Sequence, residues 1–298
     1  MIEYVSRNIV TGERAVNDDG RLQIDLGDKG GIAALFLKLT ATNGAGGSAS
    51  HGLRSQITRI RVKTGKGTYP FELSASDLYA LNTLRDGIPE ELSEDTGAGA
   101  VQSVRLPIYF SLGKDDMGYG LDLEENLGAT LEIEYKLTVS GADGFESQSL
   151  AADVDALITK DLVSPIYRGI MATAVAKSHR TGVQDPHRDI IKAPMKAVGL
   201  YAYAYKSGTA DNALVSNIKL MRTGDNDPLV DSSFSDLQYK SRTKAGSIIT
   251  SYAQIWKAPG RDGREALRAE NDSGLELHLR ELVADGEVRI IMEWIGGI

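Results

Sequence analysis

The sequence predicts an all-β chain built from two similar β-sandwiches in tandem, with a few short helices. Two observations lead to this prediction. Apolar and polar residues alternate in many short runs that are separated by turn dipeptides. In addition, landmarks in the first half of the chain recur in the same order in the second half. The alternation indicates the kind of element, and the recurrence indicates that one arrangement occurs twice.

The alternating runs are typical of antiparallel strands with one face on a core and the other toward solvent. They lie at residues 22–26, 35–39, 60–62, 121–123, 131–135, 201–205 and 275–279. The turn dipeptides are Asp19-Gly20, Asn43-Gly44, Asp86-Gly87, Asp143-Gly144, Asp262-Gly263 and Asp285-Gly286. Such pairs favour tight hairpin turns. Many short strands joined by turns predict a sandwich or a barrel.

Helical signals are few. Ser76 opens a stretch with leucines at helical spacing, and Pro89 lies just beyond its end, which predicts a helix over residues 76–84. A second helix is predicted over residues 149–163, where a serine precedes a run rich in Ala and Leu. The strand signal weakens between residues 141 and 182.

The internal repeat divides the chain. Ile60, Thr64-Gly65, Pro70 and Ser76-Asp77-Leu78 recur 158 or 159 residues later as Ile218, Thr223-Gly224, Pro228 and Ser235-Asp236-Leu237. Residues 22–39 correspond to residues 189–205, Glu134-Tyr135 to Glu293-Trp294, and residues 121–123 to 275–277. We therefore predict an N-terminal arm (1–17), a first sandwich (18–140), a linker with a helix (141–182) and a second sandwich (183–298).

Composition excludes several classes of protein. The chain has no cysteine, which removes disulfides, thiolate zinc sites, iron–sulfur clusters and cysteine nucleophiles. A net charge of −8 argues against non-specific binding to nucleic acid. No apolar run is long enough to span a membrane, and Glu3 interrupts the N-terminus too early for a signal peptide. We expect synthesis and folding in the cytoplasm.

Polar candidates for a site are scattered. The four histidines, His51, His179, His187 and His278, lack the spacing of a zinc site. Gly65-Lys66-Gly67-Thr68 lacks the spacing of a phosphate-binding loop, so we expect a β-turn with a basic tip. Asp225-Asn226-Asp227, with Asp231 nearby, offers oxygen ligands for calcium, but an Asx-rich turn explains these residues equally well.

Carboxylate pairs and tyrosines leave two further alternatives open. Glu124-Glu125 or Glu132 and Glu134 have the residue types of a glycosidase acid and nucleophile. Because Glu132 and Glu134 alternate with apolar residues, a solvated or intersubunit face is the simpler interpretation. The tyrosine stripe of residues 201, 203 and 205 is either a carbohydrate platform or a core or interface stripe. We expect no catalytic, cofactor-binding or metal-binding residue.

Four stretches, residues 57–65, 71–82, 104–110 and 127–137, resemble a known family. They are similar to a strand entering a hairpin, a short helix after it, a strand after a long surface loop, and the strand ending the first roll. The family is the double jelly-roll major capsid proteins of tailless, bacteriophage-type icosahedral viruses with an internal membrane. The resemblance covers most of the chain and implies two tandem eight-stranded jelly rolls.

The resemblance implies a structural virion protein without catalytic residues, a cofactor or a metal. It implies homotrimers that form pseudo-hexagonal capsomers, assembled in the host cytoplasm into an icosahedral shell. The implied partners are neighbouring capsomers, minor capsid or penton proteins and a nearby inner viral membrane, with no direct contact to nucleic acid. Loops at residues 43–52 and 89–99 are expected to vary without disturbing the cores. The alternative is a carbohydrate-binding or glycan-cleaving β-sandwich protein, and a tail or spike protein would show fibrous repeats that the sequence lacks.

Overall fold

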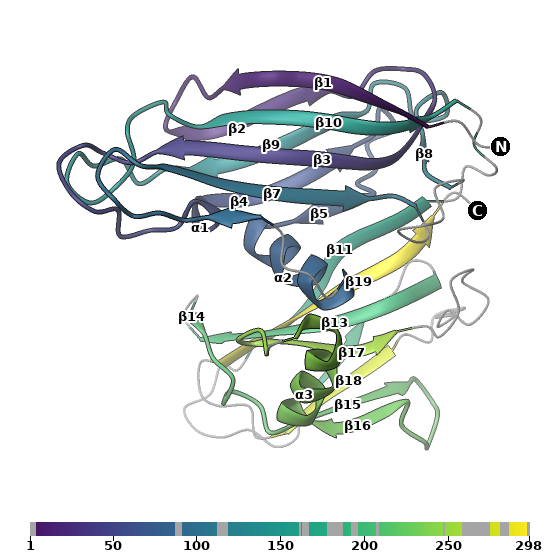
Figure 1. The fold of residues 1–298 in the computed structure, drawn as a ribbon. Helices are drawn as coiled ribbons and strands as arrows, with labels where there is room; N and C mark the ends of the chain where they lie inside the picture. Colours follow the sequence, from purple (N-terminus) through teal and green to yellow (C-terminus); the bar gives the residue numbers. More distant parts are fainter. Residues whose placement is uncertain are drawn as a thin grey trace. The chain divides into compact units, whose positions relative to one another are not determined.

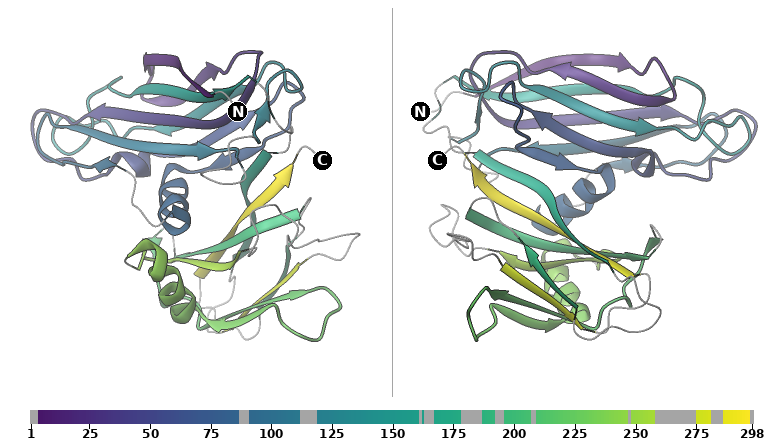
Figure 2. Two further views of the ribbon diagram at one scale, coloured as in Figure 1. Left: turned by 45° about the vertical axis from the view of Figure 1, so that its right-hand side comes forward. Right: turned by 180° about the vertical axis from the view of Figure 1, so that it is seen from behind.

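The computed structural model describes residues 4–86, 91–111, 119–160, 162, 167–177, 187–191, 196–206, 209–246, 248–257, 275–280 and 286–296. The chain divides into two compact units. The first comprises Met1–Tyr79, Pro89–Gly169 and Gly297–Ile298, and the second comprises Ala80–Ile88 and Ile170–Gly296. Each unit is a β-sandwich (Figures 1 and 2).

The first unit has two antiparallel sheets. Its strands are β1 (Tyr4–Arg14), β2 (Asp19–Asp25), β3 (Gly31–Thr42), β4 (Ile57–Lys63), β5 (Phe71–Leu73), β6 (Leu92–Ser93), β7 (Val101–Tyr109), β8 (Leu121–Asp122), β9 (Thr130–Lys136) and β10 (Ala151–Thr159). The helices are α1 (Leu53–Gln56) and the start of α2 (Ala75–Asp86), whose residues from Ala80 onward are assigned to the second unit. One sheet has the order β1-β10-β3-β7-β6, with β8 also on β3, and the other has the order β2-β9-β4-β5.

The second unit repeats this plan. Its elements are β11 (Tyr167–Lys177), β12 (His187–Ile191), β13 (Lys196–Lys206), β14 (Thr209–Ala210), β15 (Asn217–Arg222), β16 (Val230–Ser233), α3 (Phe234–Ala245), β17 (Tyr252–Lys257), β18 (Leu275–Arg280) and β19 (Gly286–Gly296). One sheet has the order β14-β13-β19-β11, with β17 also on β13. The other has the order β12-β18-β15-β16.

The two units share one strand order. When the two-residue strands β6, β8 and β14 are left aside, eight strands remain in each unit among the described residues. Numbered along the chain, they run 1-8-3-6 in one sheet and 2-7-4-5 in the other, in both units. This is the arrangement of a jelly roll, in which two Greek keys form two facing sheets. The structure confirms the predicted all-β double jelly roll.

The cores consist of the inward side chains predicted from the alternation. On β3, Leu35, Leu37 and Leu39 are at most 1% exposed, whereas Phe36 between them is 42% exposed. In the second unit the leucines of the predicted run on β18, Leu275, Leu277 and Leu279, are at most 1% exposed. A period of two therefore separates core from surface, as expected for strands that bury one face.

The helix predicted over residues 149–163 is wrong. This stretch is β10, which pairs with β1 on one side and β3 on the other. Ala152, Val154 and Ala156 are fully buried and alternate with half-buried residues. Alanine and leucine favour helices in isolation, but pairing with two neighbouring strands overrides that preference.

The same strands change the predicted boundaries of the first sandwich. Residues 4–14, predicted as part of an arm, form β1, and residues 151–159, predicted as part of a linker, form β10. The two strands pair along their whole length within the first unit. The arm and linker were inferred because neither segment shows strict alternation of large apolar residues.

Most of the predicted repeat corresponds to equivalent elements. Ile60 lies on β4 and Ile218 on β15, and each strand is followed by a short strand and a twelve-residue helix. Two predicted matches are wrong. Glu134 lies on the seventh strand of its roll, whereas Glu293 lies on the eighth strand of the other. Residues 121–123 begin at the short β8, whereas residues 275–277 lie on β18, the counterpart of β9.

The helices α2 and α3 begin in the same way. The predicted helix at residues 76–84 is confirmed, but Ser74 rather than Ser76 caps it, since its Oγ accepts the Asp77 backbone N–H (3.1 Å). In α3, the Oγ of Ser233 accepts the Asp236 backbone N–H at the same distance. Within the described part of the chain, no helix combines the length and apolar character needed to cross a bilayer.

We predict that Ser74→Ala and Ser233→Ala each lower the free energy of unfolding by about 1 kcal/mol, because each leaves a helix N–H without its acceptor. Urea unfolding followed by circular dichroism measures this loss. Ser76→Ala is the matched control and should change stability by less than about 0.5 kcal/mol. Equal losses for Ser76→Ala and Ser74→Ala would contradict the assignment of the cap.

Candidate functional site

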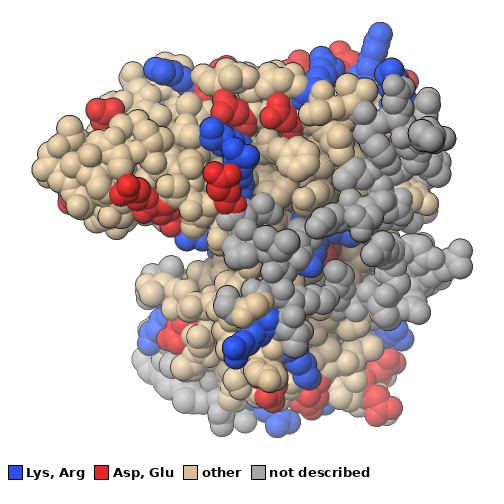
Figure 3. Space-filling model, viewed as in Figure 1, with Lys and Arg blue, Asp and Glu red and all other residues tan. Residues whose placement is uncertain are grey.

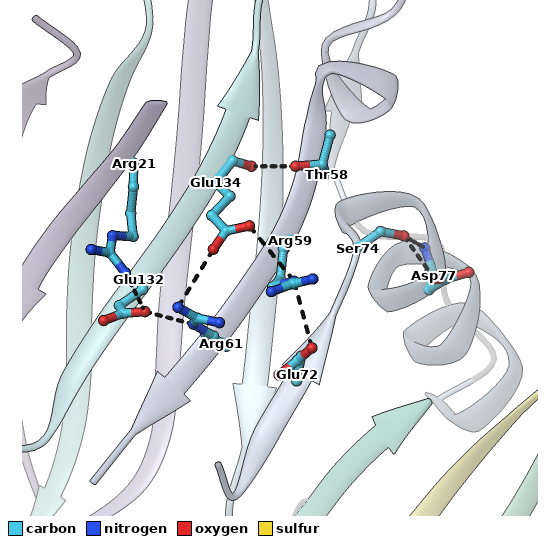
Figure 4. A network of polar contacts seen from close by, with 9 residues as sticks. All are labelled: Arg21, Thr58, Arg59, Arg61, Glu72, Ser74, Asp77, Glu132 and Glu134. Atoms are coloured by element: carbon cyan, nitrogen blue, oxygen red, sulfur yellow. Dashed lines mark hydrogen bonds and ion pairs between the residues drawn. The ribbon is translucent and has the colours of Figure 1, made fainter. Parts of the chain in front are cut away.

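The outer face of the β2-β9-β4-β5 sheet carries a ladder of charged side chains. Leu131, Ile133 and Tyr135 on β9 point into the core and are at most 3% exposed. Glu132 and Glu134 between them therefore point to the opposite face, where β2 and β4 supply arginines. We call the set Arg21, Arg59, Arg61, Glu72, Glu132 and Glu134 the charged ladder (Figure 4).

Opposite charges alternate across the ladder. The Glu132 Oε2 accepts hydrogen bonds from Arg21 Nη1 (3.2 Å) and from Arg61 Nε. The Arg61 Nη2 also lies 3.5 Å from Glu134 Oε1. Arg59 Nε lies between Glu134 Oε2 (3.7 Å) and Glu72 Oε1 (3.5 Å), as Figure 4 shows. Every carboxylate of the ladder thus has a guanidinium beside it.

Glu132 is the most enclosed member of the ladder, with a side chain only 2% exposed. Burial acts to raise the pKa of this carboxyl, but the hydrogen bond and charge of Arg61, with the charges of Arg21 and Lys63, outweigh burial and lower the pKa. Glu132 is therefore held as a carboxylate. A group held ionised in this way cannot act as a general acid, which requires a raised pKa.

The other predicted carboxylate pair lies on a turn. Glu124 and Glu125 are both exposed after β8, where Asp122 Oδ1 accepts the Glu124 backbone N–H (2.9 Å). An open hollow of about 360 Å³ borders the end of the charged ladder near Arg21 and Glu134. The aromatic residue lining it, Tyr135, is 3% exposed and offers no ring face to a sugar.

The tyrosine stripe on β13 is a packed cluster. Tyr201 is fully buried and Tyr205 is 7% exposed. Tyr203 stacks between Tyr205 (ring centroids 4.8 Å apart) and Tyr252 of β17 (4.4 Å). The Tyr201 hydroxyl donates to Glu293 Oε2 (3.1 Å). The rings contact each other, so they do not form the flat exposed platform that carbohydrate binding needs.

The remaining polar candidates also lie apart. His278 contacts Glu276 on its own strand (Nε2 to Oε2, 3.1 Å), and His51 lies in an exposed loop. His179 lies outside the described residues, and the side chain of His187 is not described. Asp225, Asp227 and Asp231 are exposed around the turn between β15 and β16. No group of three or more metal-ligating side chains occurs among the described residues.

Residues 64–68 form the predicted turn with a basic tip. The Thr64 N–H donates to the Thr68 carbonyl oxygen (2.9 Å), Gly67 has a φ of 80°, and Lys66 is exposed. A left-handed φ suits glycine in a tight turn. Elsewhere, Figure 3 shows positive and negative side chains interspersed over the described surface in this view. That distribution offers no basic stripe for a phosphate backbone in this view.

Buried amides hold the loops at one end of the first unit. Gln102 on β7 is fully buried. Its Nε2 donates to Asn43 Oδ1 (3.0 Å) and to the His51 carbonyl oxygen (3.1 Å), and its Oε1 accepts the Leu53 N–H (2.8 Å). The contact between Gln102 and Asn43 was not predicted from the sequence, because a single amide inside a strand carries no periodic signal.

Asn43 extends the amide contacts to a second loop. Its Nδ2 donates to the carbonyl oxygens of Asp95 and Gly97, both at 2.8 Å. On the other side, Gly46 donates to the Gly141 carbonyl oxygen (2.7 Å), and a Cβ at Gly46 would lie 2.7 Å from that oxygen. The loops are therefore interlocked. That they can vary without disturbing the cores stays a prediction.

Solved structures share this fold along its whole length. The STIV major capsid protein has a TM-score of 0.71 and 10% identity, covering 98% of this chain and 96% of that one. A chain of the PBCV-1 virus capsid has a TM-score of 0.67 and 8% identity, covering 99% and 94%. The major capsid protein of bacteriophage PM2 has a TM-score of 0.60 and 14% identity, covering 99% and 97%.

Two of these neighbours are major capsid proteins and the third is a chain of a virus capsid, and this chain has their fold. At 8–14% identity the likeness is one of architecture. No protein-family model and no curated protein sequence matches the chain.

We predict that Glu132→Gln lowers the free energy of unfolding by about 1–3 kcal/mol at pH 7, because two arginines lose their carboxylate. The ionised Glu132 stabilises the fold fully above the unfolded carboxyl pKa of about 4.3, and this stability is lost as pH falls through the lowered folded value. Urea unfolding between pH 7 and pH 3 should show the two proteins converging at low pH.

Glu124→Gln, on the exposed turn, is the control and should leave stability unchanged within about 0.5 kcal/mol. A Glu132→Gln protein as stable as the wild type at pH 7 would show that the charged ladder contributes no stability.

We also predict that Gln102→Ala costs about 2–3 kcal/mol, because it leaves buried partners such as the Leu53 N–H without hydrogen bonds. Hydrogen exchange should become faster in residues 43–53 and 94–100, while exchange in β15 and β18 should stay unchanged. Unchanged exchange in both loops would contradict the role of Gln102 in fixing them.

Proposed function

We propose that this chain is a structural virion protein, the major capsid protein of an icosahedral virus. The observation that carries the proposal is the length of the structural match. Both rolls align together with capsid proteins whose own chains are covered to 94–97%. A match restricted to one sandwich would support many functions, because single sandwiches occur in unrelated proteins.

The side chains are consistent with a role that needs no chemistry. Glu132 and Glu134 are neutralised by arginines, and in the tyrosine stripe Tyr201 and Tyr205 are buried while Tyr203 is half-buried and stacked. Two tandem β-sandwiches with packed cores, and with interlocked loops in the first, suit a mechanical function. We propose that it has no catalytic residue, cofactor or metal of its own.

We further propose that three copies assemble into a capsomer with pseudo-hexagonal outline. Two similar rolls per chain supply two of six corners, and three chains close the ring, so each lateral face meets a neighbour. The partners would be neighbouring capsomers, minor capsid or penton proteins and a nearby inner viral membrane, without direct contact to nucleic acid. The protein would reside in the virion after assembly in the host cytoplasm.

We predict that the purified protein has about three times the 32.1 kDa chain mass, and that this mass persists on dilution, because an obligate interface buries a large apolar area. Light scattering after size exclusion measures the mass. Negative-stain images of the native source should show shells or hexagonal plates. A stable monomer at micromolar concentration would contradict the capsid proposal, and saturable binding to a polysaccharide by that monomer would favour the carbohydrate-binding alternative.

A further inference from the structure

The described side chains of strand β1 are exposed or half-buried. Its side chains at residues 5–8 and 11–14 are exposed, and those at residues 9 and 10 are half-buried. Even Val5 is 41% exposed. The neighbouring β10 alternates between buried and half-buried side chains, as a strand on a core should. None of the described side chains of β1, those of residues 5–14, is buried, so the strand gains little from its own sandwich and leaves a surface for a further contact.

The outer edge of β1 is open among the described residues. β1 is the terminal strand of its sheet and pairs with β10 alone. Figures 1 and 2 show it along the outer margin of the first unit. An open edge offers a row of backbone N–H and C=O groups to any extended segment. A protein that works at high local concentration must protect such an edge or use it.

Only one half of this edge is protected. The register of β1 shifts between Asn8 and Val10 and again between Val10 and Glu13, so the second half is bulged. Asp153 Oδ1 fixes the bulge by accepting the Gly12 N–H (2.7 Å), and Asp155 Oδ1 accepts from Asn8 Nδ2 (2.9 Å). Bulges hinder edge pairing. Residues 4–8 keep a regular register and remain available.

The second unit offers a matching edge. β16 is the terminal strand of the β12-β18-β15-β16 sheet and pairs with β15 alone among the described residues. Its four residues are half-buried or exposed, so it too is poorly covered. Its length fits the five regular residues of β1. The charges also fit, because residues 4–8 contain one exposed base, Arg7, and no acid, whereas β16 carries the exposed Asp231.

We propose that residues 4–8 of β1 pair with β16 of a second copy of this chain, so that a sheet continues from one subunit into the next. The inference rests on the proposed capsid function, which brings copies together, and it names the strands that meet. Backbone hydrogen bonds supply the pairing, and Arg7 opposite the acidic β16 selects the partner edge. Because each chain carries both edges, the contact is heterologous and can repeat around a closed ring.

The absence of cysteine makes disulfide trapping specific. The chain carrying Ser6→Cys and Ser232→Cys, and a second carrying Ser6→Cys and Ser233→Cys, are assembled, oxidised mildly and run on a non-reducing gel. At least one pair should give covalent multimers, because paired strands bring Cα atoms within disulfide range. Ser6→Cys with Ser55→Cys, whose serine lies on α1, is the control and should stay at the monomer mass. A disulfide formed within one chain would overturn the proposal.

Reversing the charges of Arg7 and Asp231 tests the choice of partner strand independently of cross-linking. Arg7→Glu and Asp231→Arg should each weaken self-association by about tenfold, and the double variant should restore it. Arg14→Glu, in the bulged half of β1, should have no effect. Trimers or shells could form normally while neither cysteine pair cross-links and neither charge variant weakens self-association. This inference then fails and the capsid proposal stands. If the wild-type chain is a monomer, both fail.

Discussion

Each roll depends on its last strand running between its first and third strands. β10 lies between β1 and β3, and β19 lies between β11 and β13. Without β10, β1 would have no partner among the described strands, and β3 would lose one of its two long neighbours. The sandwich therefore closes only when distant parts of the chain meet. Such non-local pairing places the entropic cost of loop closure before most of the core is formed.

This constraint explains what could be predicted from the sequence. Alternation is local, so the strands around Leu35, Ile133 and Leu277 were visible as patterns. The recurring Thr-Gly, Pro and Ser-Asp-Leu landmarks revealed the repeat. β10 was not visible, because its small residues Ala152 and Ala156 look helical until two strands flank them. The mistaken match of Glu134 with Glu293 has the same origin, since sequence offset cannot distinguish the seventh strand from the eighth.

The candidate site, too, was predictable only where the signal is local in the sequence. Alternation with Leu131, Ile133 and Tyr135 placed Glu132 and Glu134 on an outer face, and the structure confirms the face. The expected contact with solvent holds for Glu134 but not for Glu132, which is only 2% exposed. The arginines that neutralise them could not be named, because Arg21 and Arg61 reach β9 through the registers of two separate strands. The buried amides of Gln102 and Asn43 were beyond prediction, since they follow from loops that meet only after the roll has closed.

The described surfaces of the first unit differ in whether their polar groups already have partners within the chain. The charged ladder pairs its own charges across the sheet, and loop amides satisfy backbone groups at the loop end, so neither surface needs a partner for stability. A backbone edge is different, because its donors and acceptors can be satisfied by water or by another strand, but not by its own side chains alone. A surface of paired charges gains little by association, since contact must first remove water from those charges. For the proposed assembly, the edges of the sheets are therefore better suited as contact surfaces than the charged ladder.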